Sequence, residues 1–394
     1  MARFLTLIYF VLTPICVSAI EVTGLMSFEE RYFYQNPTFS EQPSHQPSIV
    51  LEPEFYFSWQ DETHSLTFKP FYRLDFQDDN RSHGDIRELM WLNVQGDLEW
   101  RVGISKVFWG TTESQHLVDV INQTDIVEGI DGEDKLGQPM LHTTYTSDHG
   151  MFEMYLMPYF RKRTFVGREG RLRFPILIDE QITKYESAAE QHHLDFAFRW
   201  SHSIEDWEVG ISFFDGTQRE PFFMPAGTPT APKLRPFYPQ MRQYGLELQY
   251  IYEAWLWKLE GIHRRNLRET FTATTIGFEY THIGIMDSIY DLGWIAEHQW
   301  DERGKSASSV GQNDLFLGLR LSLNDADSSE VLFGMSQDLN FSDSRSAKLE
   351  ATTRLTEHMK LEIEAWIFQA KTQDDLLYFA RNDDFLQLNL HYYF

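Results

Sequence analysis

The last ten residues of the chain alternate between apolar and mostly polar side chains. One row consists of Leu386, Leu388, Leu390, Tyr392 and Phe394, and the other of Phe385, Gln387, Asn389, His391 and Tyr393. A period of two is that of a β-strand, whose successive side chains point to opposite sides. One apolar row and one mostly polar row suit a strand that has lipid on one side and water on the other.

The same alternation recurs along most of the sequence. Residues 49–59 and 66–76 each alternate, and the short connection 60–63 joins them. Residues 315–323 place leucine at every second position, with Phe316, Gly318, Arg320 and Ser322 between. Alternating segments that flank a tight turn predict β-hairpins.

Short and long connections follow one another along the chain. Tight turns are expected around 60–63, 96–97, 147–150, 202–206, 253–254, 324–329 and 356–358. Longer polar connections are expected at 35–47, 78–84, 107–138, 161–192, 215–239, 263–270, 301–312, 341–346 and 371–383. Membrane barrels have tight turns at one end and long loops at the other. The pattern therefore predicts an all-β fold, a transmembrane antiparallel up-and-down β-barrel of about 18 strands, with 16 as the alternative.

The first 19 residues have the features of a secretory signal peptide. Arg3 precedes an apolar run over residues 4–12, and the small residues Ser18 and Ala19 follow. We predict cleavage after Ala19, which leaves residues 20–394 as a single barrel domain. A membrane-anchoring helix is the alternative, but Pro14 interrupts an apolar run that is already short of the roughly 20 residues needed to span a bilayer.

Composition excludes several classes of protein. The chain has 34 basic and 59 acidic residues, and its formal net charge of −25 disfavours a nucleic-acid partner. A hydrophobic content of 42% is too high for a disordered protein. A large soluble β protein is the remaining structural alternative. In a soluble β protein, however, nothing requires short and long loops to alternate along the chain.

The C-terminal strand, with Phe394 as its last residue, resembles the final strand of bacterial outer-membrane β-barrels. The resemblance implies a place in the outer membrane among its lipids, and recognition of this strand by the barrel-assembly machinery. Trp109-Gly110, the segment 119–125 and the arginine-rich segment 161–173 also resemble porin-like families related to alginate-export barrels. This second resemblance implies a channel, and it specifies no substrate or binding residue.

Residues 107–138 form a connection that is too long for a simple turn, after about the fifth strand. Apolar residues at helix-like spacing predict that it folds inward against the barrel wall. Its acidic residues are Asp119, Asp125, Glu128, Asp131, Glu133 and Asp134. A constriction built from them would favour cations or neutral polar solutes.

A solvated surface loop is one alternative to this constriction. Another is a calcium site at 131–134, although the spacing matches no EF-hand, and we predict no metal or other cofactor.

A basic segment follows, with Arg161, Lys162, Arg163, Arg168, Arg171 and Arg173. We expect it in the lumen or at its mouth, facing the acidic connection across the passage. Outside the barrel it would instead meet phosphates of the outer leaflet. Other polar rows carry both charges, as at Arg73 and Lys348, which suits cross-strand pairing in a wet interior.

The function predicted from these features is a porin-like channel for passive diffusion of small hydrophilic solutes, without enzymatic activity. One alternative is an outer-membrane hydrolase, for which Ser114 with His116 and the run Ser147-Asp148-His149 supply candidate residues. Turn chemistry alone accounts for the second group. Another alternative is a receptor or scaffold barrel with a plugged lumen. The sequence leaves open whether the protein forms a homo-oligomer.

Overall fold

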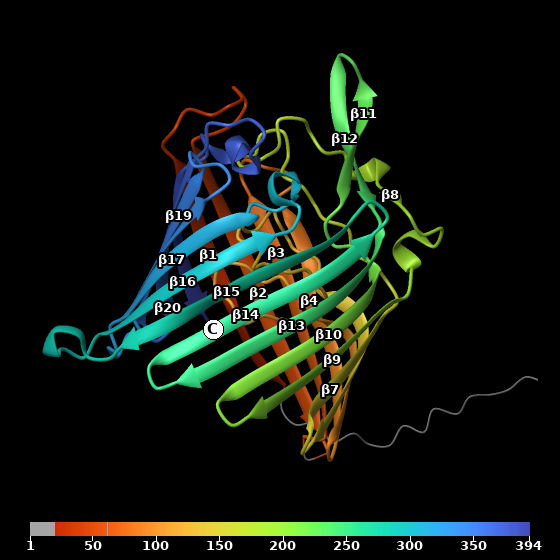
Figure 1. Ribbon diagram of the computed structural model, residues 1–394, viewed down its shortest axis with the longest axis vertical. Coiled ribbons are helices and arrows are strands. Elements are labelled where there is room, and N and C mark those ends of the chain that lie inside the picture. The colour runs from red at the N-terminus through yellow and green to blue at the C-terminus, as the bar shows by residue number, and fades with distance from the viewer. Residues whose placement is uncertain (1–19, 61) are drawn as a thin grey trace, which may run out of the picture.

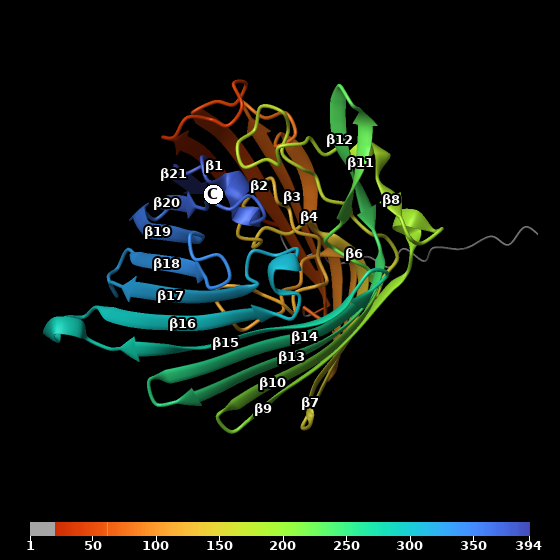
Figure 2. The same cartoon turned by 45° about the horizontal axis from the view of Figure 1, so that its top comes forward.

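A computed structural model describes residues 20–60 and 62–394 of the chain, and the predicted signal segment 1–19 lies outside them. Eighteen strands form one antiparallel sheet. It closes on itself because β1 (Glu21–Phe33) pairs with both β2 (His45–Trp59) and β21 (Phe385–Tyr393). Figures 1 and 2 show the resulting barrel. The prediction of an up-and-down β-barrel with about 18 strands is confirmed.

The barrel strands follow one another around the wall in chain order. The others are β3 (His64–Asp75), β4 (His83–Gln95), β5 (Leu98–Ser105), β6 (Gln138–Ser147), β7 (Gly150–Met157), β9 (Asp195–Ile204), β10 (Trp207–Thr217), β13 (Gln240–Tyr252), β14 (Trp255–Asn266), β15 (Thr270–His282), β16 (Asp291–Asp301), β17 (Asn313–Ser322), β18 (Glu330–Asp338), β19 (Arg345–Thr356) and β20 (Met359–Gln369). Each pairs antiparallel with the next barrel strand along the chain.

Smaller elements lie in the connections. β8 (Lys184–Tyr185), β11 (Phe222–Thr228) and β12 (Ala231–Tyr238) form a separate three-stranded sheet at the end of the barrel where the long loops lie (Figure 1). The short 3₁₀ helices are η1 (Glu180–Ile182), η2 (Glu190–His192), η3 (Ile285–Asp287), η4 (Gly304–Ser306) and η5 (Leu376–Ala380). Within the described residues, no helix is long and apolar enough to cross a bilayer.

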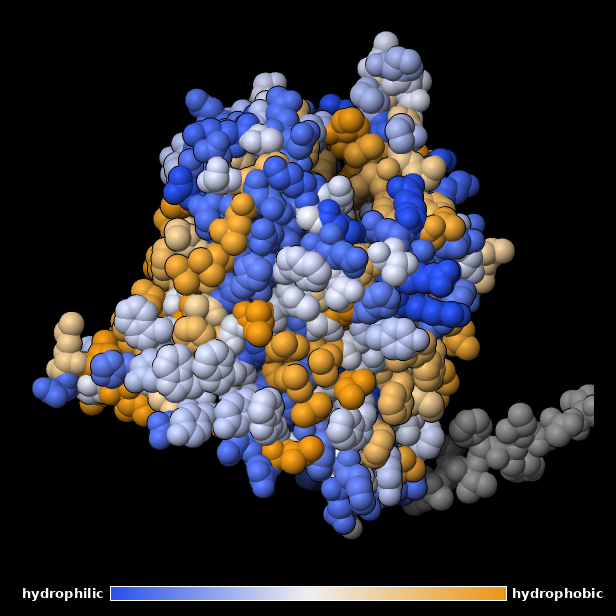
Figure 3. Space-filling model, in the orientation of Figure 1, coloured by the Kyte–Doolittle hydropathy of each residue, from blue (hydrophilic) through white to orange (hydrophobic). Residues whose placement is uncertain are grey.

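The exposure of side chains is the reverse of that in a water-soluble protein. On β21, Leu386, Leu388 and Leu390 are exposed, whereas Gln387 and Asn389 are buried. Such rows require an apolar solvent outside the barrel and polar partners inside it. Figure 3 shows hydrophobic side chains mostly over the strands, and hydrophilic ones mostly over the long loops.

The connections are sorted by length, with two departures from the prediction. The predicted long connection 263–270 is wrong: β14 and β15 extend through most of it, and only 267–269 join them. The second departure is the connection 283–290 between β15 and β16, which was not predicted. Its isoleucines at 283, 285 and 289 continue the alternation, but the backbone turns at Gly284 and Met286, where φ is 66° and 55°.

Candidate functional site

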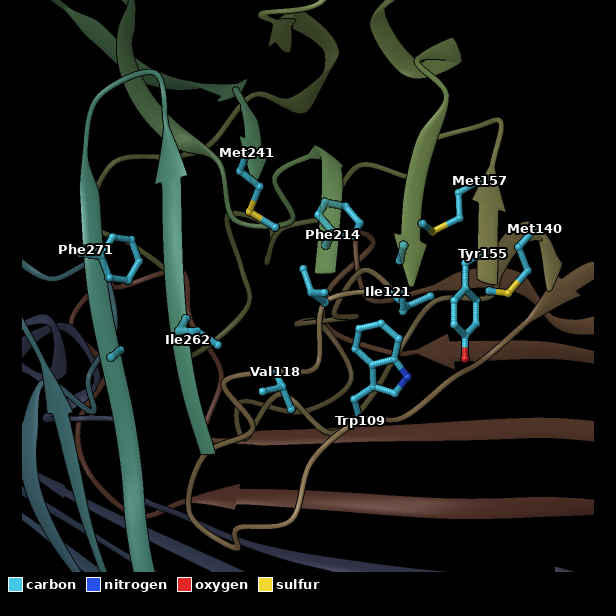
Figure 4. Close-up of a cluster of buried hydrophobic side chains, with 13 residues drawn as sticks. Trp109, Val118, Ile121, Met140, Tyr155, Met157, Phe214, Met241, Ile262 and Phe271 are labelled. Carbon is cyan, nitrogen blue, oxygen red and sulfur yellow. The ribbon is translucent and has the colours of Figure 1, made fainter. Parts of the chain in front are cut away.

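The connection between β5 and β6, residues 106–137, lies inside the barrel and is called the inner loop below. This confirms the predicted inward fold of the region 107–138. Trp109, Val118 and Ile121 of the loop are 2%, 0% and 0% exposed. They pack on a set of inward side chains that line one side of the barrel: Met140, Tyr155, Met157, Ala197, Phe214, Met241, Ile262, Phe271 and Ala273 (Figure 4). The wall from β6 to β15 is therefore dry where the loop covers it.

Wall carboxylates hold the first half of the inner loop. Glu260 on β14 accepts hydrogen bonds from the backbone N–H groups of Thr111 (2.7 Å) and Thr112 (3.0 Å) and from the Thr112 hydroxyl (2.8 Å). Glu297 on β16 accepts from three donors in the next two residues: Glu113 N (2.8 Å), Ser114 N (2.8 Å) and Ser114 Oγ (2.6 Å). An irregular loop away from bulk water needs such partners for its backbone donors. The inward carboxylates supply them.

Arginines on the opposite wall hold the second half. Arg73 on β3 donates to Glu128 through Nε (2.8 Å) and Nη2 (2.6 Å). Arg31 on β1 donates to the Glu128 carbonyl at 2.6 Å, and Arg81 donates to the Val127 carbonyl at 2.8 Å. Charge-assisted, two-pronged contacts of this kind are the strong class of hydrogen bond. The loop is therefore anchored to β1, to β3 and to the connection after β3.

Asp125 is held in the same way by β4. Its Oδ2 lies 2.9 Å from Arg87 Nη2 and 3.2 Å from His83 Nε2. His83, Asp125 and Glu128 could together offer three ligand atoms to a metal ion. The carboxylates of Asp125 and Glu128 already form ion pairs with Arg87 and Arg73, so the arrangement suits guanidinium groups better than a metal. Within the described residues, the weighed calcium segment 131–134 supplies no such group of ligands.

The other predicted acids have different surroundings. Asp131 lies 3.0 Å from Lys348 Nζ on β19, Asp119 lies 2.9 Å from Lys135 Nζ, and Glu133 lies 3.0 Å from His116 Nε2. Asp134 is exposed, and the described residues place no basic nitrogen within 4.0 Å of its carboxylate. It is the acid of the predicted set without an ion-pair partner in the described structure.

At the inner loop, side chains on one side of the lumen are more exposed to solvent than side chains on the other side. The side chains of Arg320, Lys348 and Glu350 on β17 and β19 are 30%, 23% and 35% exposed. Those of Arg31 and Arg73, beneath the inner loop, are 9% and 7% exposed. The inner loop thus bridges the barrel from β14 and β16 to β1, β3 and β4. It also reaches Arg320 on β17 through Glu113 and Lys348 on β19 through Asp131, but these two side chains stay partly exposed.

The first part of the predicted basic segment forms hydrogen bonds with the inner loop. Arg161 Nη1 lies 2.7 Å from Asp85 Oδ1 on β4 and donates to the Gly137 carbonyl at 2.8 Å. Arg163 Nε donates to the Gln123 side-chain oxygen at 2.8 Å. Lys162 instead donates to a carbonyl of its own connection, that of Glu180, at 2.9 Å. None of these three forms an ion pair with the six predicted acids among the described residues.

The rest of the basic segment joins the long loops at the mouth. Arg171 is buried, lies 2.7 Å from Asp383 and stacks 4.5 Å above the Phe33 ring. Arg173 and Arg168 lie 3.2 Å and 4.0 Å from Glu41. The basic residues therefore tie the connection 158–194 to the connections 34–44 and 370–384.

Five further residues of the site were not predicted from the sequence: Arg31, Arg81, His83, Glu260 and Glu297. All except Arg81 stand on strand faces that point inward, and polar side chains in the inward rows were the available signal. Ser114 and His116, weighed as hydrolase candidates, have separate partners. The Ser114 hydroxyl donates to Glu297, and the His116 ring contacts Glu133 and Glu260. The Ser147 hydroxyl donates within its own turn, to the Gly150 carbonyl.

Comparison with known proteins gives only remote similarity. No protein-family description and no curated protein sequence matches the chain. Among solved structures, OmpT, an outer membrane protein of Vibrio cholerae, is 9% identical, with 95% of this chain and 99% of that chain covered and a TM-score of 0.48. An engineered Rhodopseudomonas blastica porin is 10% identical, with 95% and 100% covered and a TM-score of 0.46.

Similarity at that level adds nothing to what the strands themselves show. The sheet has 18 antiparallel strands and no free edge. Its outer rows are apolar and exposed, its inner rows are polar except for the apolar side chains that the inner loop covers, and a long loop lies within it. These are the features of a porin-like outer-membrane β-barrel.

Proposed function

We propose that the protein is an outer-membrane channel for passive diffusion of small hydrophilic solutes, and that the inner loop is its constriction. The observation that carries the proposal is the contrast between the two sides of the lumen. The inner loop covers the charged residues of β1, β3 and β4, while Arg320, Lys348 and Glu350 keep their contact with water. A barrel of 18 strands is wide enough to leave an aqueous passage beside such a loop.

The charges along this passage favour cations or neutral solutes over anions. Asp125 and Glu128 are neutralised by Arg87 and Arg73, so these two acids anchor the loop. Asp134 lacks such a partner in the described structure and remains exposed. A negative side chain at a narrow point raises the local concentration of cations. Selectivity then depends on Asp134 more than on the acidic segment as a whole.

Planar-bilayer recording of the purified protein tests the proposal. We expect steady conductance in KCl and a reversal potential that shows a preference for K⁺. Replacement of residues 111–134 by a short Gly/Ser linker should raise the conductance several-fold, because the bridge across the lumen is removed. Replacement of residues 225–232, at the tip of the β11–β12 hairpin, is the matched control and should leave the conductance unchanged. A folded barrel that never conducts would contradict the proposal.

A plugged receptor barrel is the second candidate, because the loops that the basic segment joins also lie across the mouth. Arg171 holds the connection 158–194 to the connection 370–384 through a buried ion pair with Asp383. Such a barrel would exclude solutes of all sizes from liposomes. A liposome-swelling series with sugars of increasing mass separates the two functions, because a channel admits the small sugars and excludes the large ones.

We further infer that residues 1–19 direct export and that β21 is recognised during assembly. Phe394 exchanges backbone hydrogen bonds with Gly24 at 3.0 Å and 3.1 Å, so the last residue helps to close the sheet. A strand that stays unpaired until closure suits recognition by assembly machinery. Deletion of Phe394 should lower the yield of barrel in the outer membrane, whereas the same protein refolded in detergent should still form it.

A further inference from the structure

An apolar pocket lies where the inner loop meets the connection 158–194. Its volume is about 150 Å³, and every lining residue except Arg173 is apolar. The inner loop contributes Ile126 and Ile130, and the connection contributes residues that include Phe165 and Phe174. Figure 3 shows hydrophobic side chains gathered near the base of the β11–β12 hairpin, at the end where the long loops lie. Phe223 of β11 packs on both phenylalanines, at 5.6 Å and 5.5 Å between ring centroids.

Such a surface is unexpected at the mouth of a channel for purely polar solutes. Ile130 and Ile176 both line the pocket and are 39% and 38% exposed. Apolar side chains gathered in an open concave site are characteristic of ligand pockets. A cavity of this size with aliphatic and aromatic walls accommodates a group about as large as benzene. The pocket therefore fits an aromatic ring or a branched aliphatic group.

The one charged residue in the lining is already committed to protein partners. The guanidinium of Arg173 donates to the carbonyls of Arg168 and Phe174, both at 3.0 Å, and to Glu41 at 3.2 Å. It also lies 3.7 Å from the centroid of the Phe39 ring. With all three nitrogens engaged, Arg173 has little capacity left for an anionic ligand.

Two carboxylates lie close to Gly129, in the part of the inner loop that adjoins the pocket. An adjoining cavity shares Ile126 and Ile130 with the pocket and is also lined by Gly129. Its lining includes three arginines that already donate to protein oxygens, namely Arg31, Arg81 and Arg171. A Cβ atom placed on Gly129 would lie 2.9 Å from Asp134 Oδ2 and 3.1 Å from Asp131 Oδ1. Two carboxylates therefore converge one residue from Ile130. Only Asp131 has a basic partner, Lys348, within the described structure.

We propose that this pocket binds the apolar body of a small organic cation, whose charged head lies beside Asp134 and Asp131. The inference rests on the proposed channel function and deepens it by naming a class of solute. The apolar walls bind the ring or branched chain, and the phenylalanine faces add attraction for a nearby cation. The site couples solute capture to the inner loop, because Ile126 and Ile130 belong to that loop.

Two water-soluble cations that differ by one ring provide the test. Benzyltrimethylammonium and tetramethylammonium are added in turn on the loop side of a bilayer that contains the channel in KCl. We expect concentration-dependent interruptions of the current with the benzyl compound at concentrations where tetramethylammonium gives none. The double variant Ile130→Gln, Ile176→Gln should weaken the block about tenfold, since it removes two apolar walls. Asp134→Asn should weaken it as well.

Ile182→Gln is the matched control. Ile182 lies in the same connection and is 40% exposed, and it does not line the pocket. Block unchanged in this control and weakened in the double variant supports the pocket. Equal block by both cations, or equal block in the native protein and the double variant, overturns the inference. Normal conductance in KCl would then leave the proposed channel function intact.

A folded barrel that conducts no current would contradict the channel function but would not test whether the pocket binds the cation. Saturation-transfer NMR of benzyltrimethylammonium with the protein in nanodiscs gives the answer in that case. A transfer signal that falls in the double variant and persists in Ile182→Gln supports the site. Absence of transfer, or an equal signal in all three proteins, overturns it. Mobility in unheated gel electrophoresis confirms that each variant forms the barrel.

Discussion

Arg73 on β3 and Glu128 in the inner loop form a buried, two-pronged ion pair. Nε of the arginine lies 2.8 Å from Oε1 of the glutamate, and Nη2 lies 2.6 Å from Oε2. The remaining nitrogen, Nη1, donates to Glu29 at 3.0 Å and to the Ser48 hydroxyl at 2.6 Å. All the nitrogens of the guanidinium therefore have partners, and one residue joins β1, β2 and β3 to the inner loop.

Arg73→Met should destabilise the barrel and release the inner loop. Loss of one partner leaves the Glu128 carboxylate buried with a single weak contact to His83, and breaking a buried pair in this way costs about 3–5 kcal/mol. Urea unfolding of the protein in lipid measures the loss. Single-channel records should show a larger and noisier conductance, because the second half of the loop moves away from β3.

Arg242→Gln is the control for that variant. Arg242 also pairs with an acid, Asp215, at 2.6 Å, but on the outer surface with its side chain 67% exposed. Exposed pairs contribute about 0–1 kcal/mol. Stability and conductance should both stay close to native. Equal losses in the two variants would show that the Arg73 pair has no special role in holding the loop.

Glu297→Gln should loosen the first half of the inner loop. The carboxylate accepts three hydrogen bonds from residues 113 and 114, and an amide side chain offers one oxygen in place of two. Each hydrogen bond to a charged group is worth about 1.5–3 kcal/mol. Hydrogen exchange of a peptide that covers residues 111–117 should therefore speed up by about tenfold or more. Glu208→Gln, which changes an exposed inward acid of β10, should leave exchange in that peptide unaltered.

The apolar anchor of the loop makes a separate prediction. Trp109 is almost fully buried and meets Tyr155 of β7 edge-on, with 5.6 Å between ring centroids. Trp109→Ala should cost about 3–5 kcal/mol because it empties a packed site. Phe108→Ala removes the neighbouring aromatic residue, which is 55% exposed, and should cost much less. Thermal unfolding monitored by gel mobility compares the two, and similar midpoints would contradict the packing shown in Figure 4.

The barrel was predictable from the sequence because alternation is a local property. The rows of β21 and of β17 specify which side of each strand meets lipid without knowledge of any distant residue. The prediction failed where alternation continued through a turn, as at 283–290, and where polar residues continued a strand. Arg264 and Arg265 belong to β14 although they look like loop residues.

The partners of the inner loop were not predictable because they depend on closure of the whole barrel. Arg73 and Glu128 are 55 residues apart, and Ser114 and Glu297 are 183 residues apart. Composition indicated an acidic loop and a basic segment, and their simplest arrangement was face to face across the lumen. Three of the acids, Glu128, Asp125 and Asp131, in fact pair with bases on β3, β4 and β19, which the loop can reach only from inside a closed sheet.

The acidity of Asp134 predicts a change of selectivity near neutral pH. Desolvation inside the barrel and the charges of Glu128, Asp131 and Asp125 raise the pKa of the Asp134 carboxyl to about 7, and Arg87 opposes them. The side chain is nevertheless in contact with solvent. The carboxyl is charged above that pH and neutral below it. Preference for K⁺ should therefore be strong at pH 8 and should weaken as the pH falls to 6.

Reversal potentials in a KCl gradient at pH 6, 7 and 8 measure this change. His116 does not contribute in that range, because Glu133 and Glu260 outweigh the effect of its burial and raise its pKa to about 10, so that it stays protonated throughout. Asp134→Asn should give a weak and constant preference over the same range, since the titrating group is gone. If the native channel is equally selective at pH 6 and pH 8, or if Asp134→Asn retains the native pH dependence, then Asp134 does not set the selectivity of the passage.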